Sequence, residues 1–329
     1  MRPSTRIGAL LMALGLSACG SAAHGTSKHA KEAKSAVHKH GSARPVSFTY
    51  KHLYKLPSAL RDPAYTSLGG ERFALIGGLD GSDVSTSEID LGDSHKTSQV
   101  ASISTPQHDA QAALLAGKVY VFGGGGTTEL SHIFSFDLAS HKIATVGALP
   151  TASSDSSVTR IGSTAYVVGG YDNNWLNTIL SYKAPATKPK VAARLPVGLR
   201  YTGVAASGKK VIVAGGRLSN GTSNAVYSFD TTSGQVKKIA TLPQPVCHTE
   251  AVARGGWVYV VGGAKSPDMD QTSAIYAVNP NTGKVKSAGK LPVGLSDAAL
   301  ISTPKGIYVI GGMETSGAVS ANVGMLLPH

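Results

Sequence analysis

The 329-residue sequence contains only two cysteines, Cys19 and Cys247. Cys19 lies close to the N-terminus, in a segment whose pattern predicts acylation of its thiol. Cys247 is then the one remaining thiol, so no disulfide can form within the folded domain, even in an oxidising compartment. Aromatic residues make up 6% of the chain and charged residues 15%, whereas 42% of the residues are apolar. No run of 18 or more continuous apolar residues is present, so we expect no permanent membrane-spanning helix. Stability must therefore come from packing of a largely aliphatic core.

The first residues have the pattern of an export signal. Arg2 and Arg6 precede a ten-residue apolar run, Ile7–Leu16, which is too short to span a bilayer and is typical of a secretory signal. The segment Leu16-Ser17-Ala18-Cys19-Gly20 that ends the run resembles the lipobox of bacterial lipoproteins. This resemblance implies that residues 1–18 are a signal peptide and that Cys19 is acylated. We therefore predict a lipid-anchored protein on the extracytoplasmic side of a bacterial cell membrane; the alternative is an ordinary signal followed by an incidental cysteine.

A basic, polar segment follows the predicted anchor. Residues 20–47 contain few large apolar side chains and cannot form a core, so we predict a flexible basic tether over residues 19–45. Signal and tether together carry half of the net charge of +12, and such a tether is attracted to anionic lipid. The tether histidines are irregularly spaced, without cysteines or an acidic cluster beside them, and indicate no metal site. The export signal also argues against nucleic acid as a partner.

The rest of the chain is built of six similar units. Each unit has a β-branched or aromatic run followed by a glycine pair, and successive pairs are 46 to 49 residues apart. The pairs are Gly77-Gly78, Gly123-Gly124, Gly169-Gly170, Gly215-Gly216, Gly262-Gly263 and Gly311-Gly312. A Leu-Pro pair precedes most of them by about nineteen residues. Self-similarity at a fixed period near 47 residues is typical of a repeat architecture.

These units resemble kelch repeats, whose blades form β-propellers, and the resemblance covers about residues 46–329. It implies an all-β, six-bladed propeller with four-stranded blades. The tryptophan that kelch repeats usually carry on the fourth strand is missing, and Val191–Arg194 and Val236–Ala240 stand there instead. The sixth unit stops after its third strand, whereas Val46–Leu56 ends in Leu-Pro like a fourth strand. We therefore predict that the N-terminal strand closes the ring.

Six equivalent positions point to a site at the mouth of the central channel. They lie fourteen residues before the first glycine of each pair, or fifteen in the first unit, whose hairpin has an extra residue. The residues there are Asp62, Asp109, Asp155, Tyr201, His248 and Asp297. Neighbouring positions on the same predicted face add Arg61, Arg200, Arg217 and an exposed Trp175 as candidate ligand-binding residues.

Two interpretations of these polar positions remain open. Aspartate often fixes the backbone at loop-to-strand junctions, so the pattern can be purely structural. Alternatively, converging carboxylates repel one another and favour a ligand amine, a metal ion or the nearby arginines. Trp175 would then stack on a sugar or a peptide.

We predict a binding or scaffolding protein rather than an enzyme, with a protein or sugar ligand at the channel mouth and no cofactor, metal or catalytic residue assigned. No nucleophile elbow, phosphate loop or zinc-protease motif is present. The alternative is a carbohydrate-active enzyme using the same face. Resemblance to kelch mutarotases would then give roles to Arg61, Arg200 and Arg217. Resemblance to kelch-like copper oxidases would give roles to His108, Tyr201, Cys247 and His248, although a full set of metal ligands is not evident.

Overall fold

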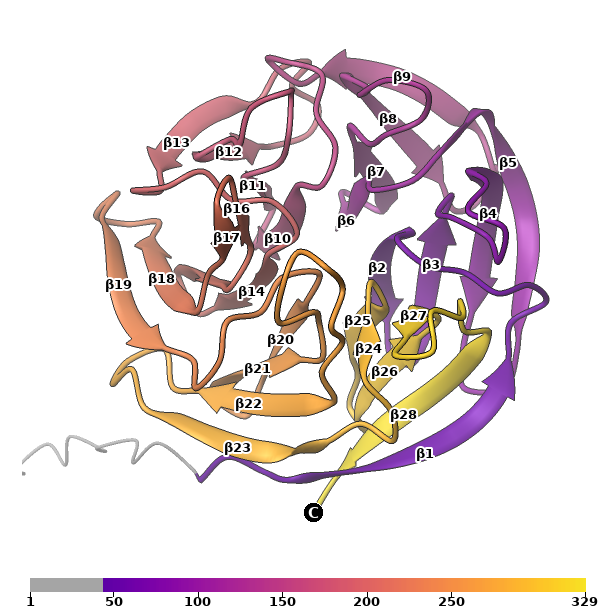
Figure 1. Cartoon of the computed structure of the whole chain (residues 1–329). Helices are drawn as coiled ribbons and strands as arrows, with labels where there is room; N and C mark the ends of the chain where they lie inside the picture. Colours follow the sequence, from indigo (N-terminus) through magenta and orange to yellow (C-terminus); the bar gives the residue numbers. More distant parts are fainter. Residues whose placement is uncertain (1–43) are drawn as a thin grey trace, which may run out of the picture. The chain divides into compact units, whose positions relative to one another are not determined.

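A computed structural model describes residues 44–329; the predicted signal peptide, Cys19 and most of the predicted tether lie outside the described residues. These residues form six four-stranded antiparallel sheets around a common centre (Figure 1). They contain no helix, and hence none long and apolar enough to cross a membrane. The all-β six-bladed propeller predicted from the repeats is confirmed.

Each of the first five blades is made from one continuous stretch of chain. Blade 1 contains β2 (Ala64–Gly69), β3 (Arg72–Ile76), β4 (Thr86–Gly92) and β5 (Thr97–Gln107), and blade 2 contains β6 (Gln111–Leu115), β7 (Lys118–Phe122), β8 (His132–Asp137) and β9 (Ile143–Ala148). Blade 3 contains β10 (Ser157–Ile161), β11 (Thr164–Val168), β12 (Thr178–Tyr182) and β13 (Lys190–Arg194). Blade 4 contains β14 (Gly203–Ser207), β15 (Lys210–Ala214), β18 (Ala225–Asp230) and β19 (Val236–Thr241), and blade 5 contains β20 (Glu250–Arg254), β21 (Trp257–Val261), β22 (Ala274–Val278) and β23 (Val285–Lys290).

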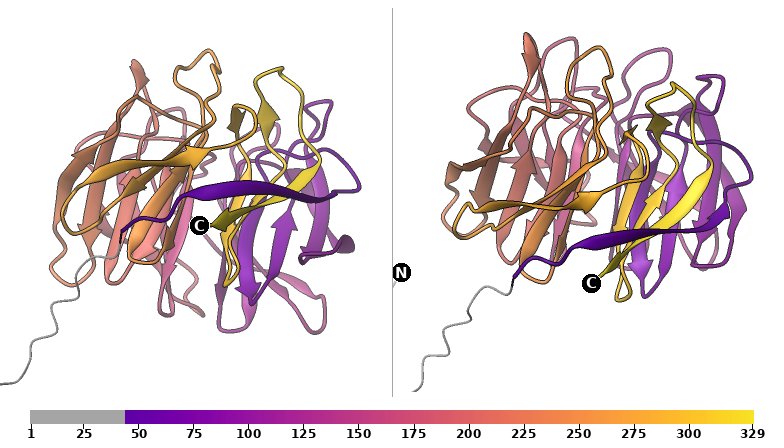
Figure 2. Two further views of the ribbon diagram at one scale, coloured as in Figure 1. Left: turned by 90° about the horizontal axis from the view of Figure 1, so that it is seen from below. Right: turned by 60° about the horizontal axis from the view of Figure 1, so that its bottom comes forward.

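Blade 6 joins the two ends of the described chain. Its strands are β25 (Ala299–Ser302), β26 (Ile307–Ile310), β28 (Asn322–Pro328) and β1 (Phe48–Lys55). β1 pairs antiparallel with β28, from Phe48 opposite Pro328 to Lys55 opposite Asn322. The ring of Phe48 also packs edge-on against Tyr259 of blade 5, with centroids 4.9 Å apart. Figure 2 shows β1 running along the outer side of β28. The N-terminal strand thus closes the ring, as predicted.

The hydrophobic core is divided among the interfaces between neighbouring blades. Successive side chains of a strand point to opposite faces, so every blade contributes to two such clusters. One cluster joins Ile76 and Ile89 of blade 1 to Val121 and Phe134 of blade 2. Small residues on the innermost strands, such as Ala112, allow six strands to crowd around the axis. The domain holds together without a disulfide because each of these contacts is repeated around a closed circle.

The glycine pairs connect neighbouring blades on one side of the propeller. In every pair the first glycine has φ between 58° and 68° and the second between 98° and 118°. The N–H of each second glycine donates to a carbonyl just before the next blade's first strand, at N···O distances of 2.7 to 2.9 Å. A Cβ on each first glycine would overlap that same carbonyl oxygen. Only glycine satisfies both requirements, which explains why the pairs recur and confirms that they lie along one rim.

We name the two sides of the propeller by their connections. The loop face carries the glycine turns and the connections between blades, namely residues 56–63, 77–85, 107–110, 123–131, 149–156, 169–177, 195–202, 215–224, 242–249, 262–273, 291–298 and 311–321. The hairpin face carries the turns within blades, namely residues 68–72, 92–97, 115–118, 137–143, 161–164, 182–190, 207–210, 230–236, 254–257, 278–285 and 302–307. Two short ladders on the loop face were not predicted: β16 (Arg217–Leu218) with β17 (Gly221–Thr222), and β24 (Leu295–Ser296) with β27 (Met313–Glu314).

Candidate functional site

The six equivalent positions form a closed ring of backbone hydrogen bonds around the axis. We call Asp62, Asp109, Asp155, Tyr201, His248 and Asp297 the axial ring. Each donates its N–H to the carbonyl of its counterpart in the preceding blade, at 3.0 to 3.2 Å, and Asp62 closes the ring by donating to Asp297. All six have φ between 51° and 57°, a region in which aspartate and histidine are enriched. The polar residues at these positions therefore have a structural role in the backbone.

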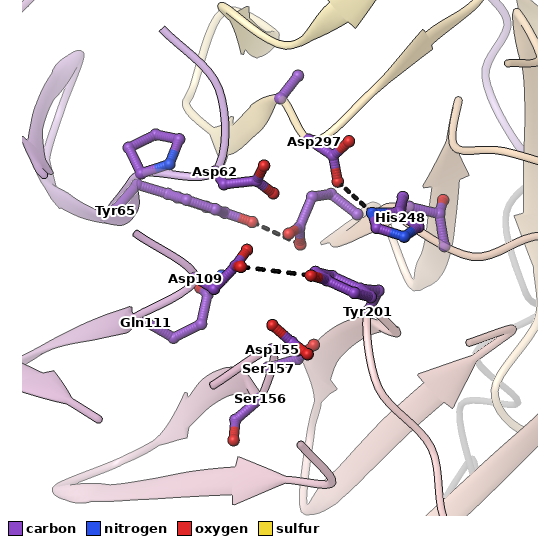
Figure 3. Close-up of a pocket in the computed structure, with 14 residues that line it drawn as sticks. Asp62, Tyr65, Asp109, Gln111, Asp155, Ser156, Ser157, Tyr201, His248 and Asp297 are labelled. Carbon is purple, nitrogen blue, oxygen red and sulfur yellow. Dashed lines mark hydrogen bonds and ion pairs between the residues drawn. The ribbon is translucent and has the colours of Figure 1, made fainter. Parts of the chain in front are cut away.

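The side chains of the axial ring also enclose a cavity. Figure 3 shows them around a common centre, with the Tyr65 side chain of β2 reaching in among them; Gln111, the first residue of β6, also lines the cavity. The cavity has a volume of about 30 Å³, which is room for about two water molecules. The carboxyl groups are almost fully covered, with side-chain exposures of 1% for Asp155 and Asp297. A backbone role and a candidate binding site thus coincide.

Each aspartate of the ring has a basic neighbour. Arg61 Nη1 lies 2.5 Å from Asp62 Oδ2, and Arg200 Nη2 lies 2.5 Å from Asp155 Oδ2. Burial acts to lower the pKa of both guanidinium groups, but these carboxylates outweigh it and raise the pKa above the ordinary value. The two permanently charged arginines therefore balance two of the four aspartates.

The other two aspartates face histidines. His248 Nδ1 lies 2.7 Å from Asp297 Oδ1, and His108 Nε2 lies 3.6 Å from Asp109 Oδ2. Burial lowers the pKa of His108, which leaves it neutral at pH 7. Burial acts to raise the pKa of Asp297, but the opposing interactions with His248, Asp62 and Ser296 lower it below the ordinary value.

Acidic groups remain in excess inside the cavity. Burial, followed by repulsion from neighbouring ring carboxylates, raises the pKa of Asp62 and Asp109 well above their ordinary range. Glu250, two residues after His248, also lines the cavity, and burial raises its pKa to about 8. These carboxyl groups thus favour either bound protons or a bound cation.

Two tyrosines complete the cavity. Tyr65 donates its hydroxyl to Glu250 Oε2 at 2.6 Å and so connects blade 1 to blade 5 across the channel. Tyr201 stacks on the His248 ring with centroids 3.7 Å apart and donates its hydroxyl to Asp109 at 3.3 Å. Sequence reasoning missed Tyr65, because it lies three residues after the ring position and none of its equivalents is aromatic.

Within residues 44–329, one ring nitrogen of His248 has no hydrogen-bond partner. Its side chain is only 9% exposed, and its buried Nε2 has no hydrogen-bond partner in the described part of the chain. Because Nδ1 faces the Asp297 carboxylate, the Nδ1–H tautomer leaves a lone pair on Nε2. Ligand atoms of Asp62, His248 and Asp297 lie within 4.8 Å of one another. The repeat spacing placed all three residues at the channel mouth, but the close approach of these particular atoms had no signal in the sequence.

The other predicted site residues lie around the mouth rather than in the cavity. The Arg200 guanidinium carbon is 4.3 Å from the centroid of Tyr171, and Trp175 packs edge-on against Tyr171 at 5.2 Å. Trp175 is half-buried, so the expectation that it is exposed is wrong: its ring covers Tyr171 and Arg200. Arg217 pairs with Arg200 through the backbone only, and its half-buried side chain has no ion-pair partner among residues 44–329.

Cys247 is unsuited to be a nucleophile. It is fully buried, with Sγ 3.8 Å from Thr222 Oγ1 and 3.9 Å from the Ser266 carbonyl. Burial raises the pKa of its thiol to about 11, so the reactive thiolate is scarce at neutral pH.

Comparison with known proteins agrees with this fold. A family profile for the Kelch motif matches residues 198–243, which contain blade 4. No curated protein matches the sequence. Among solved structures, the one described as "Structure of YjhT" superposes with a TM-score of 0.71 at 17% sequence identity, covering 82% of this chain and 95% of that chain. At this identity the likeness concerns the fold alone. The described residues thus form a six-bladed β-propeller, and one of its blades matches the Kelch motif.

Proposed function

We propose that the protein is a lipid-anchored extracytoplasmic binding or scaffolding protein that receives a small cationic group in its axial cavity. The observation that carries this proposal is the excess of buried carboxyl groups. Four aspartates of the axial ring and Glu250 line the cavity, against the two permanent charges of Arg61 and Arg200. A bound cation would relieve the repulsion among these groups without the need for bound protons.

The size of the cavity restricts the ligand. A volume of about 30 Å³ accommodates a metal ion or an ammonium group, whereas a sugar ring is much larger. Oxygen ligands and one imidazole suit either kind of cation.

The surrounding surface has the same sign of charge. Outside the axial ring the loop face carries seven acidic residues and four basic ones, although the whole protein is basic. These acidic residues are Asp80, Asp83, Glu129, Asp172, Asp268, Asp270 and Glu314. A partner that presents an ammonium group on a basic surface would therefore fit both the cavity and its surroundings.

The enzyme alternative is less well supported. An acidic sugar needs free cationic groups at the mouth, but Arg61 and Arg200 are already paired with Asp62 and Asp155. Of the three predicted arginines, only Arg217 forms no ion pair with another residue in the described part of the chain, whereas Arg61 and Arg200 both do. Turnover on a panel of acidic and neutral sugars would support the enzyme instead.

Calorimetric titration of the full-length protein tests the binding proposal. The probes are Ca²⁺, Mn²⁺, Zn²⁺, methylamine and a lysine-containing peptide, used separately so that metal and amine are distinguished. We expect one class to bind, and we expect D62N and D297N to weaken it about tenfold or more, since asparagine keeps the backbone conformation but removes the charge.

Asp268→Asn is the matched control, because Asp268 is exposed on the same face and does not line the cavity. It should change the affinity less than about twofold. Absence of binding by every probe, or equal losses in all three variants, would contradict a cation site. The anchoring part is tested separately, by mass spectrometry of the N-terminal peptide for acylated Cys19.

A further inference from the structure

The hairpin face has the opposite charge from the loop face. It carries twelve basic residues and only four acidic ones, and every blade contributes to it. The basic residues are Arg72, Lys96, Lys118, Lys142, Lys183, Lys188, Lys190, Lys209, Lys210, Arg254, Lys284 and Lys305. Such segregation of charge gives the hairpin face a positive electrostatic potential that attracts anionic partners.

The acidic residues on this face are already used by the backbone or by one partner. Asp93, Asp137 and Asp230 each accept two backbone N–H groups within their own turn. Glu71 pairs with Lys305 at 2.8 Å, and Asp137 also pairs with Lys118 at 3.1 Å. These are the ion pairs formed on this face by the described residues, so most of its lysines project without a counter-charge.

The described chain begins at this same face. The third strand of each blade runs from the loop face to the hairpin face, so β28 ends at the hairpin face with Pro328. Phe48, the first residue of β1, pairs with Pro328 and therefore lies at the hairpin face too. Arg44, the first described residue, is exposed. Lys28, Lys31, Lys34 and Lys39 precede it in sequence, after the predicted lipid-anchored Cys19.

We propose that the hairpin face lies against an anionic phospholipid surface when the protein is anchored, with the loop face turned away from the membrane. This inference rests on the proposed anchoring. Clustered lysines and arginines next to a membrane are each attracted weakly to anionic headgroups, and the attractions add over a broad face. Because the chain leaves the propeller at this face, an anchor at Cys19 raises the local concentration of these lysines near the membrane and leaves this face free to approach it.

The layout of the charges favours a planar surface over a linear polyanion. A nucleic acid is usually contacted by a basic stripe or groove with aromatic side chains for stacking. Here the basic residues are spread around all six blades. A flat layer of headgroups contacts the turns of all blades at once, whereas a strand of nucleic acid crosses only some of them.

Vesicle flotation tests this orientation. The full-length chain carries Cys19→Ser, so that no acyl chain contributes, and is mixed with vesicles of phosphatidylcholine alone or with phosphatidylglycerol. The test variant carries four further substitutions of lysines that are exposed on the hairpin turns of four blades: Lys142→Glu, Lys188→Glu, Lys209→Glu and Lys284→Glu. The control variant instead carries four substitutions of lysines that are exposed on the outer strands β1, β19 and β23: Lys51→Glu, Lys55→Glu, Lys238→Glu and Lys290→Glu. All chains share residues 1–43, so their contribution cancels.

We expect the test variant to lose about tenfold or more in partitioning to the anionic vesicles, and the control to lose less than about threefold. Thermal melts verify that both remain folded. Equal losses in the two variants, equal binding to neutral and anionic vesicles, or preferential binding to duplex DNA would overturn the proposal. Failure of the anchor is seen independently, as unmodified Cys19 in the mass spectrum of the parent protein, and leaves the flotation result interpretable.

Discussion

The loop face and the hairpin face of this propeller are built by different means. On the loop face the backbone is shared between blades: every second glycine of a pair donates to the next blade, and the axial ring connects all six. On the hairpin face most turns close through their own backbone, and the contacts between blades are made mainly by side chains, such as Arg254, which donates to the Thr303 and Pro304 carbonyls. Asp137, Asp230 and Asn279 occupy the same position in three blades, and each accepts two backbone N–H groups from residues directly after it.

This difference explains how the two faces tolerate change. A residue on the loop face must satisfy a neighbouring blade as well as its own, so the glycine pairs and the left-handed positions recur in every unit. A hairpin turn needs only one local acceptor, so its remaining residues are free to accumulate lysines. Four tests examine the contrast, in order of decreasing effect.

Deletion of residues 46–56 should have the largest effect. It removes β1 and leaves β28 as an unpaired edge, which opens the ring and exposes a template for aggregation. We expect insoluble protein or loss of a cooperative thermal transition. A soluble deletion with a single sharp melt would show that closure is unnecessary.

Glycine-to-alanine substitutions compare the faces directly. Gly169 on the loop face and Gly208 on the hairpin face have similar φ values, 63° and 60°. A Cβ at Gly169 overlaps the Leu199 carbonyl oxygen, whereas nothing lies within 4 Å of a Cβ at Gly208. We expect G169A to lower the free energy of unfolding by about 3 kcal/mol or more and G208A by about 1 kcal/mol, measured by urea denaturation. Similar losses would remove the contrast.

Glu250→Gln tests the buried charge of the cavity. The pKa of Glu250 is about 8 in the folded protein, above its ordinary value of 4.5. Between pH 4.5 and pH 8 the folded protein therefore binds a proton that the unfolded chain has released. The stabilisation is complete below about pH 4.5 and is lost as the pH rises through 8. Relative to the glutamine variant, the parent should lose roughly 1–2 kcal/mol between pH 5 and pH 9, because relaxation of the protein around the ionised carboxylate reduces the full effect. Parallel stability profiles would show that Glu250 ionises freely.

Asp230→Ala should have the smallest effect. It removes the carboxylate oxygen that accepts the Thr232 and Ser233 N–H groups in one hairpin. We expect the free energy of unfolding to fall by about 1 kcal/mol. Hydrogen exchange should increase in residues 230–236 and stay unchanged in the axial ring. Faster exchange at the loop face would show that the hairpin turns are not independent.

The repeat pattern made most of the fold predictable. The physical reason is that every blade needs two glycines in left-handed conformation at the end of its second strand, so the same sequence signal occurs six times. A single glycine pair is a weak signal, but six at one period fix the second strand of each blade and the rim along which the pairs lie. The Leu-Pro ending of Val46–Leu56 likewise identified the closing strand before any pairing was known.

The candidate site was predictable by position but not by interaction. Counting back from the glycines located all six residues of the axial ring, since these positions follow the blade geometry. Which side chain pairs with which depends on rotamers and on distances across the axis. For that reason the Tyr65–Glu250 contact, the free Nε2 of His248 and the covering of Arg200 by Tyr171 and Trp175 had no sequence signal.

Closure through β1 has a mechanical consequence. Any tension on the chain before Val46 enters the propeller along β1, whose seven paired positions with β28 are the ones that complete the circle. A pull on the N-terminal segment and the opening of the ring therefore act on the same hydrogen bonds. The strength of the pairing between β1 and β28 therefore sets the force that the domain withstands before it unfolds.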